Sequence, residues 1–328
     1  MLIWSVLLFA LGLVLLIKGG DWFVDGAVGI ANRFRLPAIV VGATVVSIGT
    51  TLPEVMTSVT GAVQGSAATA YGNAIGSIIC NTALIAAISV AVNPGPVNVK
   101  NLKMPVLFFF GAAAVYCTVA YTLQRFDWWL GLILLAAFVV YMFLTVRNGI
   151  KNPVEVSDED ELEELPSKPK KLWQELVLLV VGAALIAVGA MLLVEHGPVI
   201  ARAMGVPETV VTLLFVALGT SLPELVTTIT SLKKGNAALG IGNVIGANVF
   251  NLVLVSGAAM TISPFDLPML HPLAGLNVDM SLVIDIPVML GVMLLLCVPA
   301  LITKKLARWQ GIALLGVYVA FTVLQFVL

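Results

Sequence analysis

The chain has 328 residues, of which 60% are hydrophobic and only 11% are charged, and its formal net charge is −1. A mean hydropathy of +1.06 excludes a soluble domain and predicts an integral membrane protein. The near-neutral charge gives no basic surface for nucleic acid, so small solutes and lipid are the expected partners.

The N-terminal stretch, Met1 to Ile17, is apolar but has no basic start and no small-residue cleavage site, so it predicts a first membrane helix rather than a signal peptide. Nine further apolar runs reach the roughly 20 residues that a bilayer requires. The ten predicted helices lie at about residues 2–20, 37–63, 71–92, 104–123, 128–146, 173–194, 208–231, 237–262, 280–302 and 309–328. The predicted fold class is an all-α integral membrane protein.

A polar segment, Arg147 to Lys171, separates the fifth and sixth predicted helices and has an acidic core at residues 158–164. It is typical of a solvated linker. A calcium-binding EF-hand loop is disfavoured, because the glycine turn and the ligand spacing are missing. The predicted division is a first five-helix repeat at 1–147, a cytoplasmic acidic linker at 148–172 and a second five-helix repeat at 173–328, all within one membrane domain.

Lysine and arginine are unevenly distributed between the predicted helices. Alternate gaps, counted from the first, hold 15 of the 17 basic residues, and only Arg125 and Arg202 lie in the others. Because basic residues stay on the cytoplasmic side, both termini are predicted to lie outside the cytoplasm of the inner (plasma) membrane. Each repeat has an odd number of helices, so the second repeat is predicted to be inverted relative to the first.

The second and third helices of each repeat carry a polar signature that occurs twice. Gly49-Thr50-Thr51-Leu52-Pro53-Glu54 recurs 170 residues later as Gly219-Thr220-Ser221-Leu222-Pro223-Glu224. Gly72-Asn73-Ala74-Ile75-Gly76-Ser77 with Asn81 recurs as Gly242-Asn243-Val244-Ile245-Gly246-Ala247 with Asn251. The same offset aligns Gly12 with Gly182 and Gly19 with Gly189. Agreement without a gap indicates an internal duplication.

The two glutamates of this signature, Glu54 and Glu224, lie in apolar runs whose central turns hold no basic residue. An ionised group at mid-membrane costs about 2.5–3.5 kcal/mol, so these acids need cations or protons as partners. Hydroxyls and amides close to them complete an all-oxygen set, which is typical of a site for a hard cation. The predicted ligands besides the glutamates are Thr50, Thr51, Thr220, Ser221, Ser77, Asn81 and Asn251.

Pro53 and Pro223 are predicted to fall in the middle of the two helices that carry the glutamates. Proline removes one backbone hydrogen bond and clashes with the carbonyl a turn earlier. Carbonyl oxygens around Ser47 to Thr50, and around Ala217 to Thr220, are therefore expected to face a cavity. The glycines at 72, 76, 242 and 246 recur every fourth residue, and by themselves indicate only close packing of two backbones.

Two carboxylates neutralise one divalent ion, so a calcium-loaded site has about no net charge. The empty site with both acids ionised would be costly to move through a low-dielectric core. The charge balance therefore predicts obligatory exchange, in which the site changes sides only when it holds Ca²⁺, monovalent ions or protons.

The paired blocks resemble the two alpha-repeats of the calcium/cation antiporter superfamily, and in particular those of prokaryotic sodium/calcium exchangers of the YrbG type. The resemblance covers essentially the full length. It implies a ten-helix inverted-repeat fold whose first and sixth helices slide across the core, and antiport of Na⁺ and Ca²⁺ by alternating access. It also implies that Glu54 and Glu224 bind Ca²⁺ and that Thr50, Thr51, Thr220, Ser221 and Ser77 help to bind Na⁺.

Two positions depart from the pattern of that superfamily. Ala247 stands where many relatives have Ser, which removes one hydroxyl from the sodium ligands. Asn251 stands where some sodium-type and potassium-dependent relatives have Asp, which argues against potassium dependence. Both departures leave proton coupling open.

A Ca²⁺/H⁺ or broader divalent-cation antiporter is the alternative, and an ion channel would instead show unitary currents. An enzyme is disfavoured, because His196 and His271 have no neighbour with which to form a metal centre. The three cysteines lie in apolar runs without metal-ligand spacing, so no cofactor is expected. The expected partners are Ca²⁺, Na⁺ and the lipid bilayer, and the protein is expected to be a monomer.

Overall fold

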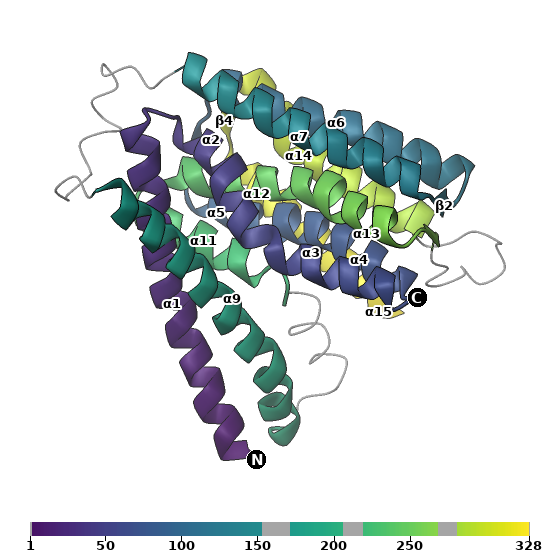
Figure 1. Cartoon of the computed structure of the whole chain (residues 1–328), viewed down its shortest axis with the longest axis horizontal. Helices are drawn as coiled ribbons and strands as arrows, with labels where there is room; N and C mark the ends of the chain where they lie inside the picture. Colours follow the sequence, from purple (N-terminus) through teal and green to yellow (C-terminus); the bar gives the residue numbers. More distant parts are fainter. Residues whose placement is uncertain (1, 153–170, 206–218, 268–280, 328) are drawn as a thin grey trace.

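The structure is a computed structural model that describes residues 2–152, 171–205, 219–267 and 281–327, and these residues are helical almost throughout (Figure 1). Eight of the described helical stretches are long and apolar enough to cross a membrane. They are Leu2–Arg33, Ala38–Val63, Thr69–Val92, Val99–Thr122, Trp128–Lys151, Leu172–Ala203, Ala237–Ile262 and Ser281–Thr303. The prediction of a multi-pass, all-helical membrane protein is thereby confirmed.

Individual helices have the following bounds. The first half of the chain contains α1 (Leu2–Arg33), α2 (Ala38–Val41), α3 (Ser47–Val63), α4 (Ala67–Cys80), α5 (Ala87–Val92), α6 (Val99–Thr122) and α7 (Trp128–Lys151). The second half contains α9 (Leu172–Ala203), α11 (Leu222–Lys233), α12 (Ala237–Phe250), α13 (Ser256–Ile262), α14 (Ile286–Thr303) and α15 (Arg308–Val327). Four π-helical segments connect or precede them: η1 (Gly42–Val46), η2 (Asn81–Ala86), η4 (Asn251–Val255) and η5 (Ser281–Asp285).

Two of the predicted helices prove longer than the sequence indicated. The first was predicted to end near residue 20 and the sixth near residue 194, but α1 continues to Arg33 and α9 to Ala203. In α1 the extension passes through Asp21 and Asp25, which find a charged partner: Lys234 Nζ lies 2.7 Å from Asp25 Oδ1 and 3.6 Å from Asp21 Oδ1. The polar residues that follow residue 20 therefore end the apolar stretch, but α1 itself continues through them.

Helices α1 and α9 pack against each other through glycines. A Cβ built on Gly12 would lie 3.0 Å from the carbonyl oxygen of Gly189, and one built on Gly19 would lie 2.9 Å from that of Gly182. The two helices are therefore antiparallel. The offset of 170 aligns Gly12 with Gly182 and Gly19 with Gly189, but in the structure Gly12 contacts Gly189 and Gly19 contacts Gly182. A bidentate ion pair closes one end of the pair, where Arg33 donates to both carboxylate oxygens of Glu175 at 2.7 and 3.0 Å.

The short strands at the two ends of the helix bundle also pair between the two halves of the chain. Strand β1 (Gly95–Pro96) pairs antiparallel with β4 (Lys305–Leu306), and β2 (Arg125–Phe126) pairs antiparallel with β3 (Phe265–Asp266). Each pairing joins one half of the chain to the other. The halves are thus interlocked and share one hydrophobic core, which includes Phe109, Phe126 and Tyr141 from the first half and Phe250 and Met293 from the second.

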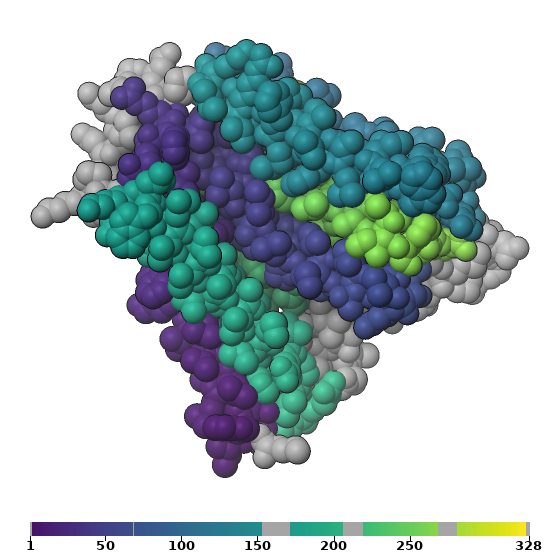
Figure 2. Space-filling view, in the orientation of Figure 1, coloured from purple at the N-terminus to yellow at the C-terminus, as the bar shows by residue number. Residues whose placement is uncertain are grey.

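The α1–α9 pair projects from the packed body of the other helices (Figures 1 and 2). Large apolar side chains along it are exposed, among them Trp4 at 68%, Val180 at 65% and Met191 at 68%. Such surfaces are expected where lipid replaces water as the solvent. Toward the body, α1 contacts α11 closely, since a Cβ on Gly20 would lie 2.8 Å from Val226 Cγ1.

We expect Gly182→Ala to destabilise the α1–α9 pair. The new methyl would lie 2.5 Å from the Phe23 backbone nitrogen and 2.9 Å from the Gly19 carbonyl oxygen, and neither backbone atom can move aside cheaply. Overpacking of this kind costs about 1–3 kcal/mol. Thermal unfolding of the detergent-solubilised protein should show a lower midpoint.

Gly291→Ala in α14 is the matched control, because no described atom lies within 4 Å of its Cβ position. Its unfolding midpoint should not fall. Equal midpoints for both variants would show that the glycine contacts do not hold α1 and α9 together.

Candidate ion-binding site

The two glutamates of the repeated signature meet in the interior of the protein. Glu54 on α3 and Glu224 on α11 are each 0% exposed, and their charges are close enough to interact. None of their four carboxylate oxygens has a hydrogen-bond partner among the described residues. No cluster of three or more His, Cys, Asp or Glu side chains occurs in the described part of the chain, so two acids supply the negative charge here.

Interrupted helices bring backbone and amide groups to the same region. Pro53 lies inside α3 as predicted, and because proline has no N–H, the carbonyl of Gly49 loses its helical partner. Asn81 and Asn251 each begin a π-helical segment, and both amide groups are fully buried without a partner. Short π-helical segments are frequent at functional sites, because they shift the helix face that a side chain occupies.

Pro223 does not lie mid-helix, and that prediction was wrong. Residues 219–221 form a turn, and α11 begins at Leu222, so Pro223 occupies the first turn of a helix. Proline is tolerated there because the N–H that it lacks would have no helical acceptor. Glu224 also lies in this first turn, where the helix dipole favours a negative charge. The predicted helix at 208–231 and the predicted site residue Ala217 fall partly or wholly outside the described residues.

Two of the predicted hydroxyl ligands lie beside one of the acids. Thr50 and Thr51 face the Glu224 carboxylate without a hydrogen bond of good geometry to it, and both are 1% exposed. Ser221 is 2% exposed and its hydroxyl has no partner of good geometry among the described residues. Ser77 and Thr220, from opposite halves of the chain, lie 3.5 Å apart through their hydroxyl oxygens.

Ser47, whose backbone carbonyl was predicted to face a cavity, uses its side chain to join two helices. Its hydroxyl donates to backbone oxygens of Gly42 at 2.9 Å and Asn243 at 3.0 Å, so its side chain fastens α3 to α12. Asn243 is a residue of the repeated signature to which sequence reasoning gave no role. Its Oδ1 accepts from Thr50 Oγ1 at 3.1 Å, and it is 0% exposed. The signal that could have found it is the Gly-Asn pair, which occurs in both repeats.

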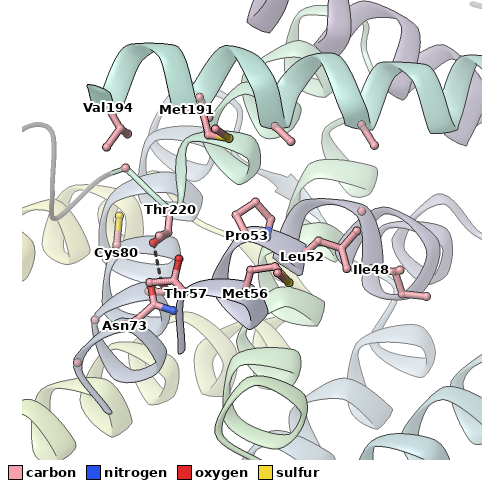
Figure 3. Close-up of a pocket in the computed structure, with 18 of the residues that line it drawn as sticks. Ile48, Leu52, Pro53, Met56, Thr57, Asn73, Cys80, Met191, Val194 and Thr220 are labelled. Atoms are coloured by element: carbon pink, nitrogen blue, oxygen red, sulfur yellow. Dashed lines mark hydrogen bonds between the residues drawn. The ribbon is translucent and has the colours of Figure 1, made fainter. Parts of the chain in front are cut away.

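A large cavity of about 1530 Å³ lies beside the site. Figure 3 shows Met191 and Val194 of α9 on one side of it and Leu52, Pro53 and Met56 of α3 on the other. Its lining also includes the site residues Ser77 and Thr220, whereas neither glutamate lines it. Those two hydroxyls are thus the part of the site that meets the cavity.

Equivalent residues of the two halves differ in whether they line this cavity. Met56, Thr57 and Asn73 line the cavity, and the offset of 170 makes Val226, Thr227 and Asn243 their equivalents. Thr227 and Asn243 are 0% exposed.

The repeated glycines have different neighbours among the described residues. Cβ positions on Gly242 and Gly246 would meet Ile39, Ala43 and Ser47, as the small-residue spacing predicted. No described atom lies within 4 Å of the Cβ positions of Gly72 and Gly76, which line the cavity. The residues that the offset of 170 makes equivalent to Ile39, Ala43 and Ser47 are 209, 213 and 217, which lie outside the described residues.

These features define a class: a multi-pass membrane protein whose interlocked halves bury two carboxylates without counter-charges. Comparison with known proteins identifies the family. A family model described as "Sodium/calcium exchanger protein" matches residues 4–147 and 175–327, and the chain belongs to this family.

Several relatives match over most of their length. An uncharacterized membrane protein of Methanocaldococcus jannaschii is 35% identical, with 97% of each chain covered. The sodium/calcium exchanger MaX1 of Methanosarcina acetivorans is 29% identical with 98% of each chain covered, and the inner membrane protein YrbG of Escherichia coli is 33% identical with 78% of this chain and 79% of YrbG covered. A solved structure of the sodium-calcium exchanger NCX_Mj, soaked with Na⁺ and Sr²⁺, has a TM-score of 0.79 at 32% identity, with 98% of each chain covered.

We expect Ca²⁺ to stabilise the protein and Glu54→Gln or Glu224→Gln to abolish that stabilisation, since each acid supplies half of the charge that offsets the ion. A ligand at 100 times its Kd raises the free energy of unfolding by about 2.7 kcal/mol, which is measurable as a higher unfolding midpoint in detergent. Without added ions the Gln variants should be at least as stable as the parent, because a buried charge has been removed.

Asp127→Asn, at an exposed carboxylate paired with Arg125, is the control and should keep the full Ca²⁺ response. A normal Ca²⁺ response in either Gln variant would contradict the assignment of that glutamate.

Proposed function

We propose that this protein is a secondary antiporter that exchanges Na⁺ for Ca²⁺ across the membrane, and that Glu54 and Glu224 bind the transported cations. The observation that carries the proposal is the meeting of two buried carboxylates, one from each half, with no hydrogen-bond partner among the described residues. Membership of the sodium/calcium exchanger family supports it, as does the fold shared with NCX_Mj.

The ligand set proposed for the cations consists of oxygens only. The carboxylates supply the charge, and the unpartnered groups of Thr51, Ser221, Asn81 and Asn251 supply neutral oxygens around them. Such a set suits hard cations such as Ca²⁺ and Na⁺. Thr50, Thr220 and Ser77 complete the proposed site, together with carbonyl oxygens freed near Ser47 to Thr50 and near Ala217.

We further propose ten membrane helices arranged as two inverted repeats, 1–147 and 173–328, joined by a cytoplasmic linker at 148–172. The antiparallel α1–α9 pair and the reciprocal strand pairings support this arrangement, because inverted copies related by a two-fold axis make each contact twice. The linker is expected to be shorter than its predicted bounds, since α7 continues to Lys151. The protein is proposed to act as a monomer.

We propose that the protein works by alternating access. A cavity beside α3 and α4 reaches Ser77 and Thr220, and α11 and α12 pack against α1, α2 and η1. Lys234 adds an ion pair with Asp25 of α1, and the equivalent position in the first half is Gln64, which has no charge. A movement of the two halves relative to each other would present the same acids to the other side of the membrane.

The decisive experiment is calcium flux into vesicles that contain the purified protein. Vesicles loaded with Na⁺ and diluted into Na⁺-free medium should take up Ca²⁺, because Na⁺ leaving down its gradient drives Ca²⁺ inward. An imposed proton or potassium gradient without Na⁺ should not drive uptake.

Protein-free vesicles and vesicles with the Glu54→Gln variant are the controls, and both should show only background uptake. Uptake that follows the proton gradient alone would replace Na⁺ by H⁺ as the counter-ion. Unitary currents without coupling would indicate a channel.

We also propose that both termini lie outside the cytoplasm, because the opposite orientation would place 15 of the 17 basic residues outside. An epitope tag added after Leu328 should be accessible to antibody or protease from the outer face of intact spheroplasts. A tag inserted in the linker at residues 158–164 is the control and should react only after permeabilisation. The reverse pattern would contradict the proposed orientation.

A further inference from the structure

Asn243 holds one of the proposed cation ligands from the opposite half of the chain. Thr50 Oγ1 donates to its Oδ1 at 3.1 Å, and Ser47 Oγ lies 3.3 Å from the same oxygen and 3.0 Å from the Asn243 carbonyl. The asparagine is 0% exposed and Thr50 is 1% exposed, so no solvent competes for these bonds. Asn243 lies on α12, and the two hydroxyls lie on α3.

Thr50 differs from six other helical threonines of this protein in the acceptor that it uses. Threonine within a helix commonly donates its proton to the carbonyl four residues earlier. Thr44, Thr82, Thr118, Thr122, Thr261 and Thr303 all do so here. The Thr50 proton instead crosses to the other half of the chain.

The direction of this bond decides what Thr50 presents to the acids. A hydroxyl has one proton and two lone pairs, so once the proton is donated to Asn243 only lone pairs are left. Thr50 lies close enough to the Glu224 carboxylate to interact with it, but its proton is directed at Asn243. An oxygen that presents only lone pairs to an ionised carboxylate needs a positive ion between them. If the Thr50 hydroxyl were free to donate a hydrogen bond to Glu224, it would stabilise the carboxylate without a cation.

The equivalent asparagine of the first repeat shows that these bonds are not required by the helix packing alone. Asn73 Nδ2 donates to the Glu54 carbonyl oxygen at 3.0 Å and to Ser58 Oγ at 2.8 Å. Thr220, the equivalent of Thr50, is instead paired with Ser77 at 3.5 Å. The asparagine–threonine bond thus forms between Asn243 and Thr50, whereas the equivalent Asn73 and Thr220 each have another partner.

We infer that Asn243 is a positioning residue of the proposed ion site. Its Oδ1 accepts the hydrogen bond from Thr50, so the Thr50 oxygen has only lone pairs left to offer the transported Na⁺ or Ca²⁺. The inference rests on the proposed function, because it takes Thr50 as a cation ligand. Asn243 itself need not touch the ion. Its effect on ion binding should therefore depend entirely on Thr50.

A double-mutant cycle tests this dependence. The variants are Asn243→Ala, Thr50→Val and the combination, and the measurement is the Na⁺ and Ca²⁺ concentration for half-maximal exchange in vesicles. Each single variant should raise the concentration for at least one ion on the order of five- to tenfold, the effect of one lost hydrogen bond or ligand. The double variant should be no worse than Thr50→Val alone, because coupled residues are not additive.

Asn243→Ala combined with Ser77→Ala is the control cycle, since Ser77 is paired with Thr220 and not with Asn243. In that cycle the fold-changes should multiply. Should Asn243→Ala not fold, Asn243→Ser replaces it in both cycles, because it also lacks the Oδ1 acceptor. The cation-induced rise in the unfolding midpoint gives a second readout of the same cycles without transport.

The outcomes distinguish a failure of the proposed ion site at Thr50 from a failure of the positioning role of Asn243. If Thr50→Val leaves both ion dependences unchanged, Thr50 is not a ligand, and both the proposed site at Thr50 and the inference about Asn243 fail. If Thr50→Val has its effect but the fold-changes of Thr50→Val and Asn243→Ala multiply, the ion site stands and only the positioning role is overturned. If a folded Asn243→Ala variant has an unchanged dependence on both ions, the positioning role is overturned as well.

Discussion

Burial of two carboxylates without a fixed counter-charge is the constraint on which the rest of this structure depends. Glu54 and Glu224 are fully enclosed, and neither has a lysine or arginine within bonding distance among the described residues. An uncompensated buried charge costs several kcal/mol, so the site is stable only with a cation or a proton in it. In an antiporter this instability is useful, because it makes passage of an empty site rare.

The duplication supplies the geometry that this constraint requires. One acid comes from each half, and the halves are interlocked through the α1–α9 glycines, the strand pairs and a shared core. Neither half alone would hold both charges that balance a divalent ion. In the proposed alternating access, inverted copies that make the same contacts twice exchange between two arrangements.

The two repeats differ at several positions near these contacts. Lys234 pairs with Asp25, whereas the first repeat has Gln64 at the equivalent position. Ser77 offers a hydroxyl at the cavity, whereas its equivalent Ala247 is buried and offers none. Asn243 and Asn73 occupy equivalent positions and bond to different partners. Equivalent residues of the two repeats therefore have different surroundings.

The sequence by itself determined the membrane class, and it singled out a repeated signature with one buried acid in each copy. Long apolar runs follow from bilayer thickness, and a buried acid stands out because hydrocarbon disfavours it. The sequence did not determine where α1 and α9 end, because charged residues can remain helical when a partner such as Lys234 neutralises them. It also misplaced Pro223 within its helix, since proline fits the first turn of a helix as well as a break in one.

Only the tertiary structure decided which residues line the cavity and which polar groups face each other. The repeats have nearly the same signature, so local sequence cannot distinguish Gly72, which lines the cavity, from Gly242, which packs against Ile39. Nor can it show that Thr50 donates to Asn243, because residues 193 positions apart meet only when the two halves have assembled. Local sequence sets each residue's chemistry, but the partner of a buried hydroxyl is set by long-range packing.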